Sequence, residues 1–288
     1  MKVLNKKKPT SLAQKIVFGF VFVLFSLYAL SLLYVAVFAL FSALKTNNEL
    51  LQHMFDLPQK WLFENFITAF DVLKHGKTNA IGMIFNSIWY TAGGTFLTIA
   101  CSTTLSYAVS KYKFFGRNAI YTISLVIMIL PIVGSLPATY KLIKTLGIDN
   151  SPALLITFCS GFGFNFIVLY GFFQNLSWSY AEAAFIDGAS DVRTFLQVML
   201  PQAMPAITSL VILSAIGTWN DYQGPILYLQ NMPTLAVGLF EFEKSCKQNM
   251  QFHILFAGLI ISIVPILVIF IIFQETIMSN TVAGGLKG

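Results

Sequence analysis

The segment from Ser177 to Ile207 reads SWSYAEAAFIDGASDVRTFLQVMLPQAMPAI and lies between two long apolar runs of the chain. Ser179 stands three residues before Glu182, a spacing that predicts a capping box at the start of a short helix. Gly188 can adopt the left-handed conformation that often ends a helix, so we expect the helix to stop there. The first part of the segment is therefore predicted to be a helix followed by a glycine turn.

A second helix is predicted directly after this turn. Ser190 is a favourable N-cap, and Asp191 places a negative charge near the positive end of the helix dipole. One apolar face is expected from the residues at helical spacing, which are Val192, Phe195, Leu196 and Met199. Proline removes a backbone donor, so Pro201 and Pro205 predict a break or kink before the next apolar run.

Two packings of the first helix remain open from physical reasoning alone. Ala181, Ala183 and Ala184 give this helix a small surface, which allows another backbone to approach closely. The helix can pack on the chain's own bundle as a cytoplasmic loop, or it can pack on a separate protein.

The composition is that of an integral membrane protein. Of the 288 residues, 56% are hydrophobic and only 10% are charged, and the mean hydropathy is +0.73. Several apolar runs are long enough to cross a bilayer. Part of the net charge of +6 comes from lysines before the first apolar run, which are Lys2, Lys6, Lys7, Lys8 and Lys15. We interpret these lysines as orientation signals, and no binding of nucleic acid is expected.

Three groups of residues in the opening segment resemble the EAA loop of ABC-importer permeases. They are Glu182-Ala183-Ala184, Asp187-Gly188-Ala189 and Leu200-Pro201, in an order similar to that of the carbohydrate-uptake branch. The resemblance implies a coupling helix that sits in a cleft of a separate ATPase subunit. The residues implied to couple to the ATPase are Glu182, Ala183, Ala184, Asp187, Gly188, Leu200 and Pro201.

Six membrane spans are predicted, which places both termini in the cytoplasm. The spans cover about 16–44, 81–109, 119–140, 152–173, 206–229 and 252–273. The first run is longer than the apolar core of a signal peptide, which has about 7–15 residues, so we expect it to remain uncleaved. The predicted division is a cytoplasmic N-terminus at 1–15, a first transmembrane helix at 16–44, an extracytoplasmic loop at 45–79, a five-helix permease core at 80–276 that includes the coupling segment 177–205, and a cytoplasmic tail at 277–288.

Polar positions inside the predicted spans are candidates for the translocation path. Asn165 lies at membrane depth, so it either bonds a neighbouring helix or faces the path. The run from Thr218 to Tyr222 resembles the W-N-acid-aromatic signature of sugar permeases, which implies pathway or substrate roles for Trp219, Asn220, Asp221 and Tyr222. The alternative for Asp221 is a solvated carboxylate at the outer end of a helix. Pro131 and Pro137 interrupt the third span, either beside the path or as packing kinks.

Two further segments resemble parts of maltose-type importers. The outer loop 230–251 contains TLAVGL, which implies docking of a solute-binding protein at Thr234, Leu235 and Gly238. The C-terminal sequence TVAGGLKG resembles the tail of the second permease subunit of those importers. That resemblance implies ATPase contacts at Gly284, Gly285, Lys287 and Gly288, with a frayed terminus as the alternative.

Neither an ATP site nor a metal site nor a redox pair is expected in this chain. Gly76-Lys77-Thr78 lacks the first glycine of a phosphate-binding loop, because Asp71 stands five positions earlier. The cysteines stand far apart at Cys101, Cys159 and Cys246, and we interpret them as free thiols that pack as small apolar groups. The histidines, His53, His75 and His253, are scattered outside the spans.

The resemblance implies an all-α membrane protein with the type I ABC-importer permease fold. We interpret the chain as one of two permease subunits of a bacterial importer for a sugar or oligosaccharide. The implied partners are a second permease subunit, two ATPase subunits that use ATP and Mg²⁺, and an extracytoplasmic sugar-binding protein. The chain itself is expected to be no enzyme and to hold no cofactor. The alternatives are an ABC permease for a non-sugar solute and a secondary transporter. A secondary transporter predicts an inverted repeat or ion-coupling carboxylates inside the spans.

Overall fold

The computed structural model describes residues 12–130 and 135–285, and these residues are mostly helical. The elements up to the loop before α5 are α1 (Leu12–Ala43), α2 (Asn47–Gln52), α3 (Glu64–Val72), β1 (Lys74–His75), β2 (Thr78–Asn79) and α4 (Ala80–Lys111). They are followed by α5 (Arg117–Ile129), α6 (Ser135–Leu146), η1 (Pro152–Phe158), α7 (Phe164–Asn175), α8 (Ser179–Ile186), α9 (Asp191–Thr194), η2 (Phe195–Met199), α10 (Leu200–Trp219), α11 (Gln223–Tyr228), α12 (Leu235–Gln248) and α13 (Phe252–Gly285). The two strands pair antiparallel in a small hairpin.

The described residues form two compact units. The first unit lies within Met1–Ala69 and Cys246–Ile260, and the second lies within Phe70–Ser245 and Ile261–Gly288. By length and apolar composition, two helical stretches among the described residues could cross a bilayer, namely Leu12–Ala43 and Asp191–Trp219.

In the first unit, the loop after α1 is closed by hydrogen bonds to backbone carbonyls. The last carbonyls of a helix have no partner within that helix. The buried Asn65 side chain donates to the carbonyl of Ala43 at 2.8 Å and to that of Lys45 at 2.9 Å. The Lys45 ammonium is itself buried and donates to the carbonyls of His53 and Met54 at 2.8 and 3.0 Å. Asn65 therefore has a structural role at the end of α1.

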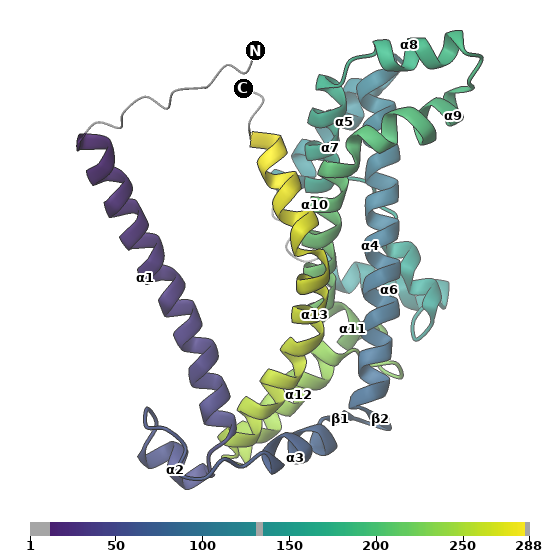
Figure 1. The fold of residues 1–288 in the computed structure, drawn as a ribbon. Coiled ribbons are helices and arrows are strands. Elements are labelled where there is room, and N and C mark those ends of the chain that lie inside the picture. Colours follow the sequence, from purple (N-terminus) through teal and green to yellow (C-terminus); the bar gives the residue numbers. More distant parts are fainter. Residues whose placement is uncertain (1–11, 131–134, 286–288) are drawn as a thin grey trace. The chain divides into compact units, whose positions relative to one another are not determined.

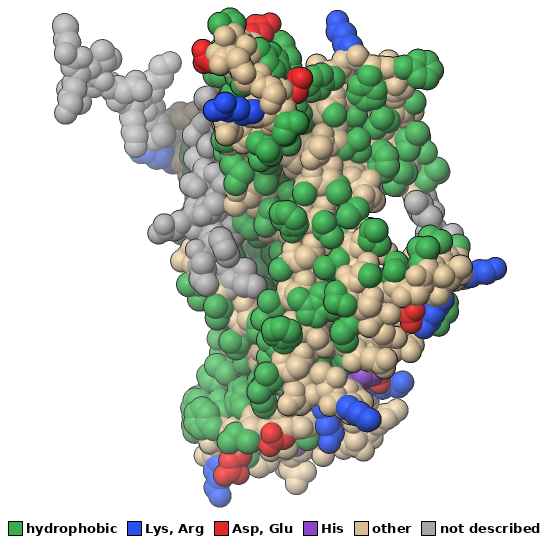
Figure 2. All heavy atoms as spheres, turned by 90° about the vertical axis from the view of Figure 1, so that its right-hand side faces the viewer, with side chains coloured by type: hydrophobic (Ala, Val, Ile, Leu, Met, Phe, Trp, Pro, Cys, Tyr) green, Lys and Arg blue, Asp and Glu red, His purple; other side chains and the backbone are tan. Residues whose placement is uncertain are grey.

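In the second unit, α4 is the helix on which the others pack (Figure 1). It contacts α7, α10 and η1, and small residues allow a close approach on one side. A Cβ at Gly93 would lie 2.5 Å from Leu155 Cδ1, and one at Gly94 would lie 3.1 Å from the Phe158 ring. Figure 2 shows many hydrophobic side chains on one face of the molecule and charged side chains near both its upper and its lower end.

Several predicted spans are divided in the structure. Region 119–140 contains most of α5 and the first half of α6, region 152–173 contains η1 and most of α7, and region 206–229 contains most of α10 and all of α11. Gly161 and Gly163 have φ values of +68° and +96°, which interrupts the helix between η1 and α7. Pro131 lies outside the described residues, and Pro137 lies in the first turns of α6.

Helix also extends into regions predicted as loop or tail. The predicted outer loop 230–251 contains α12, and α13 continues to Gly285 although the tail was predicted to start at 277. The spans at 16–44 and 81–109 coincide with the long helices α1 and α4.

Candidate functional site

The candidate site is the coupling segment, residues 177–205, which begins with α8. The capping box predicted from Ser179 and Glu182 is wrong. The N-cap position is Trp178, and Ser179 is already inside the helix. The Ser177 hydroxyl takes over the capping, because its Oγ accepts from the Ser179 N–H at 3.3 Å. The Glu182 side chain is exposed.

The turn that ends α8 confirms the prediction for Gly188. Its φ is +80°, in the left-handed region. The Ala189 N–H donates to the Ala184 carbonyl at 2.9 Å, and the Gly188 N–H donates to the Phe185 carbonyl at 3.0 Å. These two bonds form a Schellman motif. A Cβ at Gly188 would meet no described atom within 4 Å, so only the backbone conformation constrains this residue within the chain.

The start of α9 is tied to the end of α4. Ser190 is the N-cap, as predicted, and its Oγ accepts from the Arg193 N–H at 3.4 Å. The Tyr112 hydroxyl, just after α4, donates to Asp191 Oδ1 at 2.7 Å. Burial and this hydrogen bond raise the pKa of the Tyr112 phenol, so it remains a proton donor at neutral pH.

The predicted apolar face of the second helix is wrong in phase. Phe195 and Met199 turn inward, but Val192 and Leu196 are 68% and 51% exposed. This part of the chain contains η2, a π-helical turn, and its extra residue rotates the residues that follow it relative to a regular helix. The break predicted at the prolines is not found, since the helix continues from Asp191 to Trp219, and the alternative of a kink stays a prediction. The wide turn precedes Pro201 and accommodates the missing backbone donor.

Further contacts fix the coupling segment to α4. The Lys111 ammonium donates to the carbonyl of Leu176 at 2.5 Å, and burial lowers the pKa of this lysine. The ring of Tyr107 stacks on Phe195 with centroids 4.6 Å apart. Trp178 packs edge-on against the Tyr112 ring at 5.9 Å. Two elements of the segment are therefore attached to the last turns of one long helix.

The two sides of α8 have different environments. Ala181 and Ala184 are buried against the chain's own helices. The opposite side is open, with Glu182, Ala183 and Asp187 exposed and Ile186 86% exposed. Both packings considered from the sequence are thus compatible with one helix, on opposite sides. At the far end of the segment, Leu200 is half-buried in the helix core and Pro201 is exposed.

The predicted pathway residues lie near the other end of α10. Asn165 of α7 donates to the Ser214 hydroxyl of α10 at 3.1 Å, which confirms the helix-bonding alternative for this residue. Trp219 is buried, whereas the exposed Asn220 side chain bonds back to its own helix, at the Ile216 carbonyl. Tyr222 stacks on Phe240 with ring centroids 4.8 Å apart and planes at 14°.

Asp221 connects three elements. Its Oδ2 accepts from the Tyr90 hydroxyl of α4 at 3.1 Å, and its Oδ1 accepts from the Gly224 N–H of α11 at 3.1 Å. A Cβ at Gly224 would lie 2.7 Å from Asp221 Oδ2, so glycine leaves room for the carboxylate. The carboxylate is half-buried and satisfied by donors from both sides, which the sequence did not predict.

The predicted docking residues are buried in the second unit. Thr234 and Leu235 are each 1% exposed, and the Leu235 N–H donates to the Ser87 hydroxyl at 2.8 Å. A Cβ at Gly238 would lie 2.3 Å from the Met83 sulfur. These residues hold the start of α12 against α4, and their docking role stays a prediction.

The predicted ATPase-contacting tail is only partly described. Gly284 and Gly285 are the last residues of α13, and Lys287 and Gly288 lie outside the described residues. Contact of this tail with an ATPase stays a prediction.

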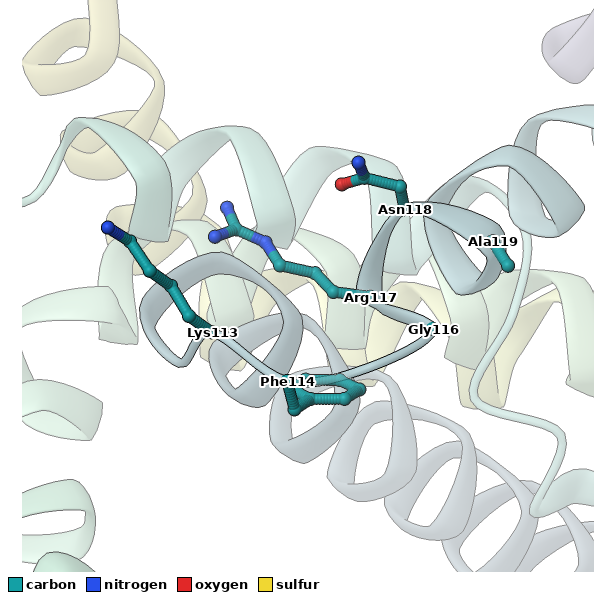
Figure 3. Close-up of a pocket in the computed structure, with 6 residues that line it drawn as sticks. All are labelled: Lys113, Phe114, Gly116, Arg117, Asn118 and Ala119. Atoms are coloured by element: carbon teal, nitrogen blue, oxygen red, sulfur yellow. The ribbon is translucent and has the colours of Figure 1, made fainter.

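A basic cavity lies in the loop between α4 and α5. It has a volume of about 320 Å³ and is lined by Lys113, Phe114, Gly116, Arg117, Asn118 and Ala119. In Figure 3 the side chains of Lys113 and Arg117 extend to the same side of the loop. The loop between the two helices is therefore hollowed and carries two basic side chains.

Comparison with known proteins gives a consistent set of relatives. The chain is 29% identical to the diacetylchitobiose uptake system permease protein NgcG of Streptomyces coelicolor, over 85% of this chain and 81% of that protein. It is 30% identical to the arabinooligosaccharides transport system permease protein AraQ of Bacillus subtilis, over 90% and 92%. It is 32% identical to the galactooligosaccharides transport system permease protein GanQ of the same species, over 69% and 70%.

The fold is also found in a solved structure and in a family model. A chain from the crystal structure of a bacterial ABC transporter involved in the import of the acidic polysaccharide alginate superposes with a TM-score of 0.73. The identity is 24%, and the match covers 93% of this chain and 99% of that one. Residues 94–279, which include the coupling segment, match the model described as binding-protein-dependent transport system inner membrane component. The chain is a member of this family of inner-membrane transport proteins.

Proposed function

We propose that the chain is a transmembrane permease subunit of a binding-protein-dependent ABC importer that carries a sugar or oligosaccharide. The relatives named above are permeases of diacetylchitobiose, arabinooligosaccharide and galactooligosaccharide systems, which supports this substrate class. The observation that carries the proposal is the two-sided environment of α8. One side is buried in a core cluster that also contains Tyr107 of α4, and the other side presents exposed small and apolar residues to a partner.

The attachment of α8 suggests how force is transmitted. A partner that holds the open side of α8 moves α4 through the contacts of Lys111 and Tyr112. It also moves α10, because α9, η2 and α10 form one continuous helix. The spans then tilt as rigid bodies and exchange inward-open and outward-open states. In this proposal the subunit performs no bond chemistry, and ATP and Mg²⁺ are bound by the partner subunits.

The proposed assembly is a heterodimer of permeases with two ATPase subunits and an extracytoplasmic sugar-binding protein, in a bacterial inner membrane. Six spans with both termini in the cytoplasm place the coupling segment on the side where ATP is available. The lysines near the N-terminus support that orientation. The residues from Trp219 to Tyr222 are proposed to lie along the path.

A co-purification experiment tests the proposal. The chain is expressed with its second permease and ATPase, and ATP hydrolysis is measured with and without the sugar-loaded binding protein. Ile186→Glu should abolish binding of the ATPase, because a charge would be placed in an apolar contact at a fully open position. Leu57→Glu is the control, since Leu57 is an exposed apolar residue in the predicted extracytoplasmic loop.

The outcome separates the proposal from its alternatives. Sugar transport by the purified chain in vesicles without any ATPase would overturn the proposal in favour of a secondary transporter. A different result would be stimulation of ATP hydrolysis only by a binding protein loaded with a non-sugar solute. That result would contradict a sugar substrate, but the assignment as an ABC permease would stand.

A further inference from the structure

The fold brings together two cysteines that are far apart in the sequence. Cys101 lies in the middle of α4, and Cys159 follows directly after η1. Both are free thiols, and the Cys101 side chain is half-buried whereas that of Cys159 is exposed. Both also line the same cavity of about 540 Å³, beside small and mostly apolar side chains. The expectation of free thiols is confirmed, and the structure adds that tertiary packing brings two of them to one cavity.

The register of the two segments supports this pairing independently. The Thr98 hydroxyl, one turn before Cys101, donates to the Phe158 carbonyl at 3.4 Å. On the other side, a Cβ at Gly161 would lie 3.4 Å from the Cys101 carbonyl oxygen and 3.3 Å from Leu105 Cδ2. Residues 98, 101 and 105 share one side of α4. Residues 158–161 run along this side of α4. The backbone of this segment therefore lies close to α4 both before and after Cys159.

The segment that carries Cys159 is the connection between η1 and α7. Gly161 and Gly163 both have positive φ values, which lets the chain turn sharply before α7 begins. From there α7 leads directly into the coupling segment. A covalent bond between Cys159 and α4 would fix this turn, and with it the start of α7.

We propose that Cys101 and Cys159 are a modification site, a dithiol that closes reversibly into a disulfide and fastens the 159–163 turn to α4. The oxidant is a small uncharged peroxide, which can enter the apolar cavity. One thiol attacks the O–O bond of hydrogen peroxide, giving a sulfenic acid and one water. The second thiol then displaces the sulfenic hydroxyl as a second water, so that two thiols and one peroxide give one disulfide and two waters. A dithiol reductant reverses the reaction by thiol–disulfide exchange.

The bond itself is tested on the full chain in membranes, without any assumption about transport. A Cys246→Ser background removes the third thiol. After treatment with hydrogen peroxide, mass spectrometry of the digested chain should find the peptides of Cys101 and Cys159 linked, and the link should disappear after reduction. The matched controls Cys101→Ser and Cys159→Ser should show no link within the chain. Persistence of both free thiols, or sulfinic acid at either residue without a link, would overturn the proposal.

The effect of fixing the 159–163 turn to α4 is tested in the assembled importer. This second test rests on the proposed function. Oxidation should reduce the importer's ATP hydrolysis about tenfold or more if the turn must move during the cycle. Reduction should restore the rate, and Cys159→Ser should be insensitive. A linked chain with an unchanged rate would overturn the fastening. A chain that binds no ATPase would contradict the proposed function alone, because the link is measured on the chain itself.

Discussion

The hydroxyl of Tyr112 donates a 2.7 Å hydrogen bond to Asp191, and so joins the residue after α4 to the first residue of α9. Both residues are partly open to solvent, so the bond contributes about 0.5–1 kcal/mol to stability. Its larger role in the proposed mechanism is positional, because it transmits displacement of the coupling segment to α4.

The first prediction concerns the pH dependence of this bond. The pKa of the Tyr112 phenol is raised in the folded chain, chiefly by burial and then by Asp191. The stabilisation is therefore complete below the ordinary tyrosine pKa of about 10 and decreases as the pH rises above it. Thermal unfolding of the wild type should lose stability between about pH 10 and 11 to a greater extent than Tyr112→Phe. Identical profiles for the two proteins would refute the coupling.

The second prediction separates strain from partner contact at Gly188. Gly188→Ala should lower the free energy of unfolding by about 1 kcal/mol, because the left-handed conformation disfavours a Cβ. Gly188→Asn should cost less, since asparagine tolerates this conformation. Gly188→Leu should abolish uptake while the chain still inserts into the membrane. Normal uptake by Gly188→Leu would exclude a close partner at this turn.

The third prediction concerns Asp221. Asp221→Ala leaves the Tyr90 hydroxyl and the Gly224 N–H without their acceptor, which should destabilise the chain by about 1–3 kcal/mol. Asp221→Asn retains one acceptor and should cost less. The measurement is the Tm in detergent together with the uptake rate. Unchanged Tm and uptake for Asp221→Ala would favour the solvated carboxylate.

The fourth prediction concerns the contact of Gly238 with Met83. Gly238→Ala places a methyl group 2.3 Å from the present position of the Met83 sulfur and should cost about 1–3 kcal/mol. In a Met83→Ala background the same substitution should cost clearly less, because the space is vacated. Equal costs in the two backgrounds would show that α12 is not held against α4 at this point.

The fifth prediction concerns the reactivity of Cys246. Burial raises the pKa of this thiol to about 11. In a variant with Cys101→Ser and Cys159→Ser, alkylation by N-ethylmaleimide should be slow at pH 8. Its rate should rise about tenfold for each pH unit up to the pKa, because the thiolate is the nucleophile. A rate at pH 8 equal to that of free cysteine would contradict the burial of this side chain.

The sequence predicted features that depend on neighbouring residues more reliably than features that depend on packing. The left-handed turn at Gly188 and the cap at Ser190 follow from local backbone chemistry, and both are found. The cap at Ser179 failed because Ser177, two residues earlier, offered a competing acceptor. Family resemblance, rather than physical pattern, led to the transport class.

Long-range arrangements were outside the reach of a single sequence. Nothing in the spacing of Cys101 and Cys159 indicates that they line one cavity, because this arises from the packing of η1 on α4. The donors around Asp221 come from α4 and α11, and the burial of Thr234 depends on α4. The exposure of Val192 and the π turn that begins at Phe195 were also not indicated by the spacing of the residues.

The π turn of η2 also separates the exposed residues from the buried residues along one continuous helix. Residues before it, such as Val192, present the outer surface, whereas residues after it, such as Ile207 and Leu210, fill the interior of the bundle. Under the proposed function, substitutions before this turn change the contact with the ATPase subunit without changing the packing inside the bundle. Removal of one residue from this turn would rotate the two surfaces into a new alignment, with every side chain itself unchanged.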